Sequence, residues 1–154
     1  MIINRFSFGG AAAIVTSMAL IVGLDAATAT KPTIIGGLLI VALADNLTDS
    51  LSIHIYQESE RLERHEAFVA TLTNFAARLL VSLSFVPLVL LLPLHQAVFV
   101  SLGWGLMLLC GLTYLLARER GASIVSEISK HIAVALVVIF ASKAIGRWIL
   151  VSMT

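Results

Sequence analysis

Residues Ala44–Glu66 read ADNLTDSLSIHIYQESERLERHE and decide how the remainder of the chain can fold. They continue the apolar run Ile34–Leu43, and no glycine or proline interrupts the chain after Gly37, so one helix is predicted across both segments. Two carboxylates one turn apart, in a segment otherwise suited to lipid, are costly unless they are paired or bind a ligand. This stretch is therefore the predicted functional centre. At about 100° per residue, one helix face collects Asp45, Thr48, Asp49, Ser52 and Tyr56, and roughly the opposite side collects Asn46, Ser50, His54 and Gln57.

The composition indicates an integral membrane protein. Of the 154 residues, 59% are hydrophobic and 12% are charged, and the mean hydropathy is +1.01. A soluble domain of this size cannot bury so much apolar surface. The net charge of +1 says nothing about nucleic acid, but the sequence has no basic patch with interleaved aromatic residues, so no nucleic-acid partner is expected. The single cysteine, Cys110, excludes a disulfide within one chain and a zinc site built from cysteines.

The apolar segments predict an all-α bundle of five membrane-spanning helices, with residues 1–154 forming a single domain. Each segment approaches or exceeds the roughly 20 residues that span the hydrocarbon core. For the first span, a signal peptide is the competing interpretation, because Ala27-Thr28-Ala29 has the small-x-small pattern of a cleavage site. Pro87 is expected to kink the third span. The spans are expected at about residues 7–25, 33–57, 67–92, 97–117 and 131–152.

The loop charges predict the orientation of the bundle, because cytoplasmic loops carry an excess of lysine and arginine. The rule favours a cytoplasmic N-terminus and an outer C-terminus, in what we expect to be a bacterial or archaeal cell membrane. On this assignment the cytoplasmic segments carry Arg5, Arg61, Arg64, Arg118, Arg120 and Lys130, and the outer loops carry only Lys31.

The third span carries a polar stripe, because Asn74, Arg78 and Ser82 recur every four residues. An arginine this deep in a membrane helix requires a partner. We expect Asp45 or Asp49 to be that partner. A salt-bridged cluster with a purely structural role is the alternative to a site that binds a cation.

The sequence contains no Gly-rich phosphate loop, nucleophile elbow, HExxH motif or Cys/His zinc spacing, so no enzymatic activity is expected. Asp45 and Asp49 lie on the same helix, which is poor geometry for acid and base attack from two sides. Oxygen-rich ligation by Asp, Glu, Asn and His suits cations such as Mn²⁺ and Fe²⁺. A carboxylate in a low dielectric can also bind a proton near neutral pH, which would allow exchange of protons for metal.

Several segments spread over the chain carry a resemblance. They are Val15–Leu24 (VTSMALIVGL), Ser59-Glu60-Arg61 at the end of the second helix, Leu83-Ser84-Phe85 followed by Leu91-Leu92-Pro93, and Ile145-Gly146-Arg147. Together with the five spans, they are similar to the vacuolar iron transporter family over most of the chain. The resemblance implies a five-helix protomer, a symmetric dimer, and export of Fe²⁺ or Mn²⁺ from the cytosol against protons, along a path near the dimer axis.

The chain departs from the family pattern around the metal site. The family's early first-helix Asp-Gly falls on Ala12-Ala13, its second-helix methionine on Asp49, and its Glu-Tyr on Ile53-His54. The segment Glu58–Glu66 stands where the family has its cytoplasmic metal-binding helices. One interpretation is that the metal site has moved from the first helix to the second and third. The other is a divergent member with a different substrate, or with none.

The leading hypothesis is a homodimeric, proton-coupled transporter of divalent metal ions in the lipid bilayer, with Fe²⁺ or Mn²⁺ as substrate and no tightly bound cofactor. In this hypothesis Asp49 is a metal ligand and the proton acceptor. Asp45 is a second ligand, and Asn74 is a neutral oxygen donor. Arg78 is the counter-ion that holds the empty site. The alternative is a non-transporting membrane scaffold in which the Asp–Arg cluster only fixes helix packing.

Charged residues near the helix ends complete the hypothesis. His54 and Glu58, one turn apart, are the predicted cytoplasmic entry and the remaining metal ligands. The segment Glu58–Glu66 either gathers metal at this entry or is a solvated helix end with i,i+4 ion pairs. Lys143 and Arg147 lie one turn apart in the last span, and we expect both to reach toward the membrane interface.

Overall fold

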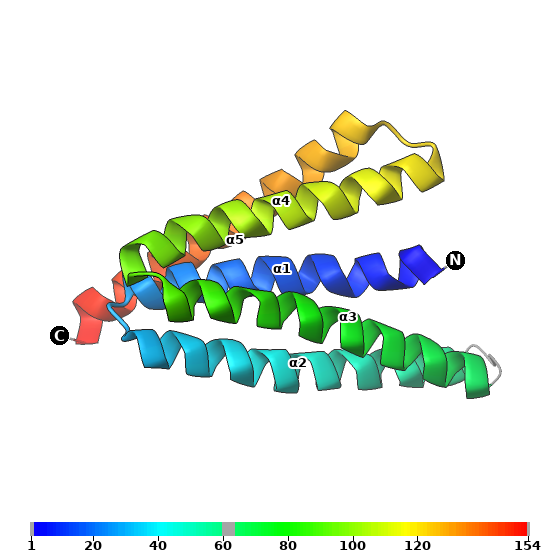
Figure 1. Ribbon diagram of the computed structural model, residues 1–154, viewed down its shortest axis with the longest axis horizontal. Helices are drawn as coiled ribbons and strands as arrows, with labels where there is room; N and C mark the ends of the chain where they lie inside the picture. The colour runs from blue at the N-terminus through cyan, green and yellow to red at the C-terminus, as the bar shows by residue number, and fades with distance from the viewer. Residues whose placement is uncertain (1, 60–63, 154) are drawn as a thin grey trace.

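The computed structural model describes the backbone of residues 2–59 and 64–153, and the side chains of residues 9–56 and 68–153. Within these residues the chain is all-helical, and five of its helices are long and apolar enough to cross a membrane. The predicted all-α membrane architecture is therefore confirmed (Figure 1). The helices are α1 (Ile2–Ala26), α2 (Lys31–Ser59), α3 (Arg64–Leu91), α4 (Leu94–Arg120) and α5 (Ile124–Met153).

Helices α4 and α5 extend further than the expected spans. The spans were expected at about 97–117 and 131–152, whereas only residues 121–123 separate the two helices. Helix α4 ends because Gly121 adopts a left-handed conformation with φ of 63°. The N–H of Ala122 then donates to the carbonyl of Ala117 at 3.0 Å, as in a Schellman motif. Polar residues continue a helix readily once it has left the hydrocarbon core, which explains the extension.

Pro87 does not end α3, which continues to Leu91. Proline removes one backbone donor and crowds the preceding turn, so its cost is local. The bend expected at Pro87 stays a prediction.

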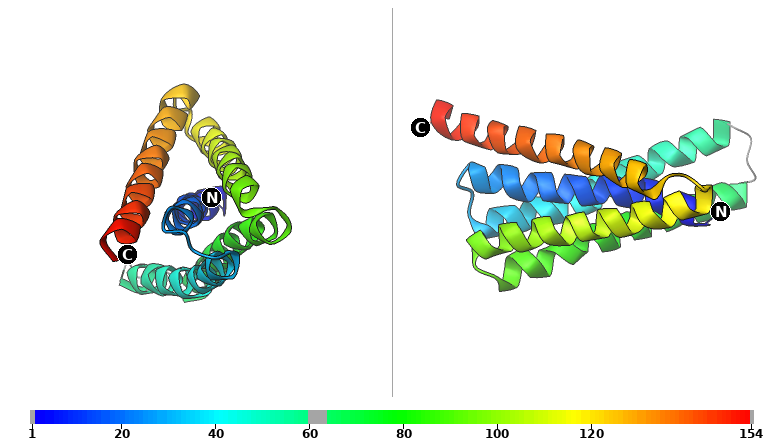
Figure 2. Two further views of the ribbon diagram at one scale, coloured as in Figure 1. Left: turned by 90° about the vertical axis from the view of Figure 1, so that its left-hand side faces the viewer. Right: turned by 90° about the horizontal axis from the view of Figure 1, so that it is seen from above.

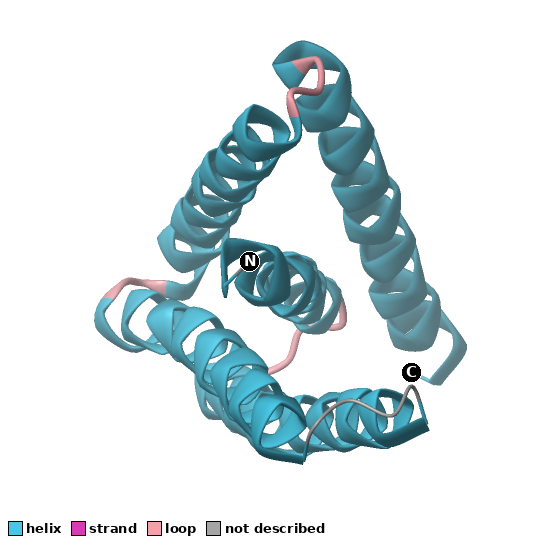
Figure 3. Ribbon diagram, turned by 90° about the vertical axis from the view of Figure 1, so that its right-hand side faces the viewer, coloured by secondary structure: helices cyan, strands magenta, loops and turns pink. Residues whose placement is uncertain are grey.

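Helix α1 lies at the centre of the bundle and contacts each of the other four helices. Viewed along the bundle, α3, α4 and α5 surround it, and α2 packs mainly on α3 (Figures 2 and 3). Removing α1 would leave the bundle without its central element. This arrangement favours a membrane helix over a cleaved signal peptide for the first span.

Small residues allow the other helices to approach α1 closely. A side chain at Gly9 would meet Asn74 and the aliphatic stem of Arg78 on α3. A side chain at Gly146 of α5 would meet the carbonyl of Gly23 on α1. The first contact places polar side chains of α3 against bare backbone of α1, and the second brings the backbones of α1 and α5 together. The apolar core around α1 is formed by Ile14, Met18, Ile21, Ile34, Leu38, Phe85, Val89 and Leu109.

Candidate functional site

Arg78 is the largest fully buried side chain of the described structure, with an exposed fraction of 2%. It lies near the middle of α3, within the candidate membrane span Phe68–Leu91. Asn74 and Ser82 are buried on the same face of this helix. The predicted polar stripe is therefore confirmed, and it faces the protein interior. A guanidinium in this position must find acceptors within the bundle, because neither water nor lipid headgroups are at hand.

All three nitrogens of the Arg78 guanidinium contact oxygen atoms of α2, two through hydrogen bonds and one through an ion pair. Nε donates to Oδ1 of Asn46 at 2.8 Å. Nη2 lies 2.8 Å from Oδ2 of Asp45, and Nη1 lies 2.6 Å from Oδ2 of Asp49. The sequence predicted Asp45 or Asp49 as the partner, and the arginine in fact binds both. These bonds join α2 to α3 at the middle of both helices.

Asn46 is the member of this cluster that the sequence argument missed. It was assigned to the side of α2 opposite the aspartates, but it lies only about 60° from Asp49 around a helix. Asn46 is 1% exposed, and its amide nitrogen donates to the carbonyl of Ala42 at 2.6 Å. This bond turns the amide oxygen toward Arg78. The i,i+4 spacing of Leu38, Ala42 and Asn46, all buried, was the signal that could have identified the inner face of α2.

The cluster carries an excess of negative charge, because two carboxylates share one guanidinium when all three groups are ionised. The side chains of Asp45 and Asp49 are 42% and 44% exposed, whereas Arg78 is almost completely buried. Neither Oδ1 atom has a hydrogen bond or ion pair to any residue that the structure describes. Each carboxylate therefore presents one oxygen to Arg78 and keeps the other open on the outer side of α2.

Asn74 lies beside this cluster with no hydrogen-bond partner for its side-chain amide among the described residues. Its exposed fraction is 2%, so bulk water does not supply the partner. Its oxygen and the stem of Arg78 both border the space above Gly9 of α1. Asn74 thus keeps its predicted place near the cluster, and its role as an oxygen donor stays a prediction.

The described residues include only part of the predicted cytoplasmic entry. His54 is half-buried on α2 and is not without an interaction partner. Glu58 and the remainder of Glu58–Glu66 lie outside the residues whose side chains are described. Among the described residues, no three His, Cys, Asp or Glu side chains gather to hold a metal ion. The described part of one chain therefore brings together Asp45 and Asp49 but does not add His54 to them.

We expect Asn46→Leu to destabilise the protein, because it leaves the buried Nε–H of Arg78 without an acceptor. A buried donor without a partner costs about 1–3 kcal/mol. Thermal unfolding in mild detergent should therefore begin at a clearly lower temperature. The matched control is Thr48→Val on the same helix, since the Thr48 hydroxyl is exposed and donates only to the carbonyl of Ala44 at 2.8 Å. Equal unfolding temperatures for both variants would contradict the assignment of Asn46 as an acceptor for Arg78.

Comparisons of this chain with protein-family models, with curated proteins and with solved structures found no match. The likeness to vacuolar iron transporters therefore stays a prediction that depends on the residues quoted above.

Proposed function

We propose that this chain is a membrane transporter of cations, with Asp45 and Asp49 as the ion-binding pair. The observation that carries the proposal is the half-exposed carboxylate pair, which a single buried guanidinium neutralises only in part. Both aspartates lie in the interior of the candidate span Lys31–Tyr56. An exposed, negatively charged group at this depth is costly in contact with lipid. A cation, a proton or a polar surface must therefore cover it, and exchange among these is the step that transport needs.

The chemistry of the donors favours protons and divalent metal ions, with Fe²⁺ and Mn²⁺ as the proposed substrates. Carboxylate and amide oxygens are ligands that such cations accept. In the empty site Arg78 balances one of the two negative charges. An arriving metal ion would bind the open oxygens of Asp45 and Asp49, and Asn74, which borders the stem of Arg78, is the proposed further donor. Protonation of the aspartates would then release the metal, which couples the two fluxes. Export from the cytosol follows from the predicted family alone.

A homodimer would complete the site, since the described part of one chain offers only two carboxylates at this point. The outward face of α2 carries Asp45, Thr48, Asp49 and Ser52 along the middle of the span. The hydroxyls of Thr48 and Ser52 donate to carbonyls of their own helix. Two copies that meet along this face would bring four carboxylates together near the dimer axis. We propose this arrangement, with the N-termini in the cytoplasm of a bacterial or archaeal cell.

A structural scaffold is the second candidate function. The observation in its favour is that every nitrogen of the Arg78 guanidinium already has an acceptor within the protein. Such a cluster could serve only to fix α2 against α3, and the aspartates would then have no substrate. The open Oδ1 atoms, and the Asn74 amide with no hydrogen-bond partner among the described residues, are the features that this interpretation leaves without a role.

The replacement Asp49→Asn should abolish uptake of Mn²⁺ into proteoliposomes under an imposed pH gradient. The amide cannot take up a proton, and it does not supply the charge that offsets dehydration of the ion. The fold should survive, because Asp45 and Asn46 still bind Arg78. Asp49 is 44% exposed, so the change costs less than the roughly 3–5 kcal/mol of breaking a fully buried ion pair. A purely structural role would appear as a loss of thermal stability with uptake retained.

The double replacement Asp49→Asn with Arg78→Gln separates the two functions, since it removes both charges of one ion pair. Recovered stability without uptake supports Asp49 as an ion ligand. Recovery of both stability and uptake would sink the proposed site, because Asp49 would then be only a partner of Arg78. The single replacement Arg78→Leu is not informative, since it is damaging in either case.

Cross-linking tests the proposed dimer face. In a chain whose native Cys110 is replaced by serine, a cysteine introduced at Thr48 should cross-link two copies in membranes through a short bis-maleimide. The control is a cysteine at Val137, which is 68% exposed on α5. We expect covalent dimers from the first variant and few from the second. Dimers from the Val137 variant alone would place the contact elsewhere and contradict a shared site on α2.

A further inference from the structure

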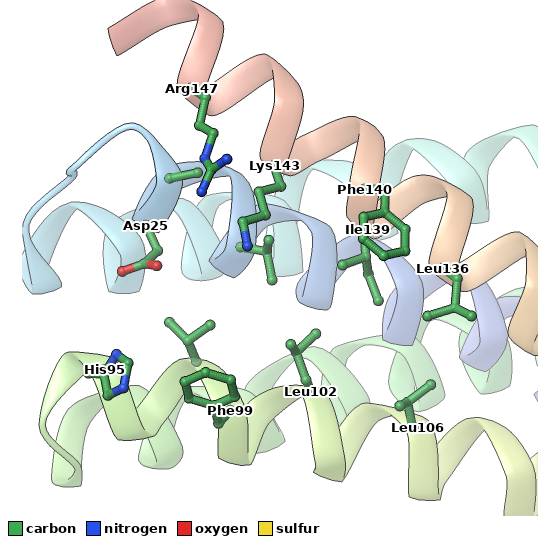
Figure 4. Close-up of a pocket in the computed structure, with 13 residues that line it drawn as sticks. Asp25, His95, Phe99, Leu102, Leu106, Leu136, Ile139, Phe140, Lys143 and Arg147 are labelled. Atoms are coloured by element: carbon green, nitrogen blue, oxygen red, sulfur yellow. The ribbon is translucent and has the colours of Figure 1, made fainter.

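A second polar centre lies far from Arg78, in a cavity of about 550 Å³ between α1, α4 and α5. The cavity opens near the end of the bundle where α1 ends and α4 begins (Figure 4). Its volume is in the range of roughly 300–1,000 Å³ that is typical of ligand pockets. The transport proposal does not involve any of its lining residues.

The two ends of the cavity differ in chemistry. One end carries Asp25 from α1, His95 from α4, and Lys143 and Arg147 from α5. Lys143 and Arg147 extend from α5 into the space above Asp25, and His95 lies across it on α4 (Figure 4). The remainder of the cavity is apolar and follows the facing sides of α4 and α5. Its walls include Phe99, Leu102, Leu106, Leu136, Ile139 and Phe140.

The cations at the polar end have no anionic partner in the described structure. Neither Lys143 nor Arg147 forms an ion pair with any described residue, and Asp25 forms none either. The two cations outnumber the one carboxylate, so this end has an excess of positive charge. The first turn of α4 adds to it, because Pro93 provides no side-chain cap for the helix N-terminus. Charge complementarity therefore calls for an anion at this end.

We propose that the cavity binds one anionic phospholipid, with its phosphate on Lys143 and Arg147 and one acyl chain between α4 and α5. The two cations lie in the C-terminal half of α5, and long basic side chains toward the end of a membrane-spanning helix reach for the lipid headgroups. The apolar walls continue from them toward the interior of the span, as an acyl chain does. A free phosphate ion would satisfy the cations but leave the apolar part of the cavity unused. A neutral lipid would fill that part but leave the cations unpaired.

Two local contacts shape the site for this ligand. The ring of His95 packs edge-on against Phe99, with ring centroids 5.0 Å apart. This contact positions a third nitrogen-bearing side chain, beside those of Lys143 and Arg147, at the polar end. Asp25 would repel a phosphate that entered too deeply, and so it favours a headgroup placed on the α5 side. Cations that only reached toward the interface would need neither this cavity nor its apolar continuation.

Native mass spectrometry of the full chain in detergent tests the proposal. The purified protein is titrated with dioleoyl phosphatidylglycerol, with dioleoyl phosphatidylcholine, and with inorganic phosphate. We expect one phosphatidylglycerol to bind each chain, with an affinity at least about tenfold higher than that of phosphatidylcholine. The pair K143Q and R147Q should abolish this preference. The pair K130Q and R120Q removes two other exposed cations, near the opposite end of the bundle, and should leave the preference unchanged.

A third variant tests the apolar part of the cavity. Leu136→Trp narrows the cavity without removing a cation, and Leu136 is 41% exposed, so the fold tolerates the change. We expect it to weaken phosphatidylglycerol binding severalfold. Equal binding of the two lipids, or a preference that survives loss of Lys143 and Arg147, would overturn the proposal. So would binding of inorganic phosphate as tight as that of the lipid, since the site would then be an anion site without an acyl chain.

Discussion

The burial of one guanidinium, that of Arg78, is the constraint on which the structure depends most. A charged group at the middle of a membrane span is stable only if its hydrogen bonds are satisfied within the protein. Asn46 and Asp45 accept hydrogen bonds from the guanidinium, and Asp49 forms an ion pair with it. They lie within two turns of a single helix, so the arginine fixes both the distance and the register of α2 against α3. Gly9 of α1 leaves the space that the arginine stem occupies.

The pairing of Arg78 with two aspartates is also the basis of the proposed function. The single positive charge of Arg78 neutralises only one of the two carboxylates. A net negative charge therefore remains on the outer side of α2. A purely structural cluster would stabilise the fold more with a single aspartate. The second aspartate adds a desolvation cost that Arg78 cannot fully offset. The proposed transport function gives this second carboxylate a role, since the site can then exchange a proton or a metal ion without losing the arginine. The cavity on the opposite side of α1, with its positive end, serves a separate purpose in our account.

The sequence was most informative where a long-range physical requirement is strict. The five helices could be predicted because apolar runs of membrane length admit no other backbone, and Arg78 had to meet a carboxylate because a buried charge requires a partner. The role of Asn46 could not be predicted by dividing α2 into two faces, since an arginine side chain reaches acceptors over a wide arc. The cavity at Lys143 and Arg147 depends on residues from three helices. Their meeting with His95 is a matter of tertiary packing, which periodicity within one helix does not reveal.

Labelling with a hydrophobic carbodiimide tests the central claim most directly, because this reagent reacts with protonated carboxyl groups in apolar surroundings. The chain is labelled in lipid nanodiscs, and the adducts are assigned by peptide mass spectrometry. Our account predicts an adduct on Asp45 or Asp49 that decreases as Mn²⁺ is added, while any adduct on Asp25 does not change. Absence of an adduct on both aspartates, or labelling that Mn²⁺ does not reduce at any concentration, would contradict the claim that this carboxylate pair exchanges protons for metal.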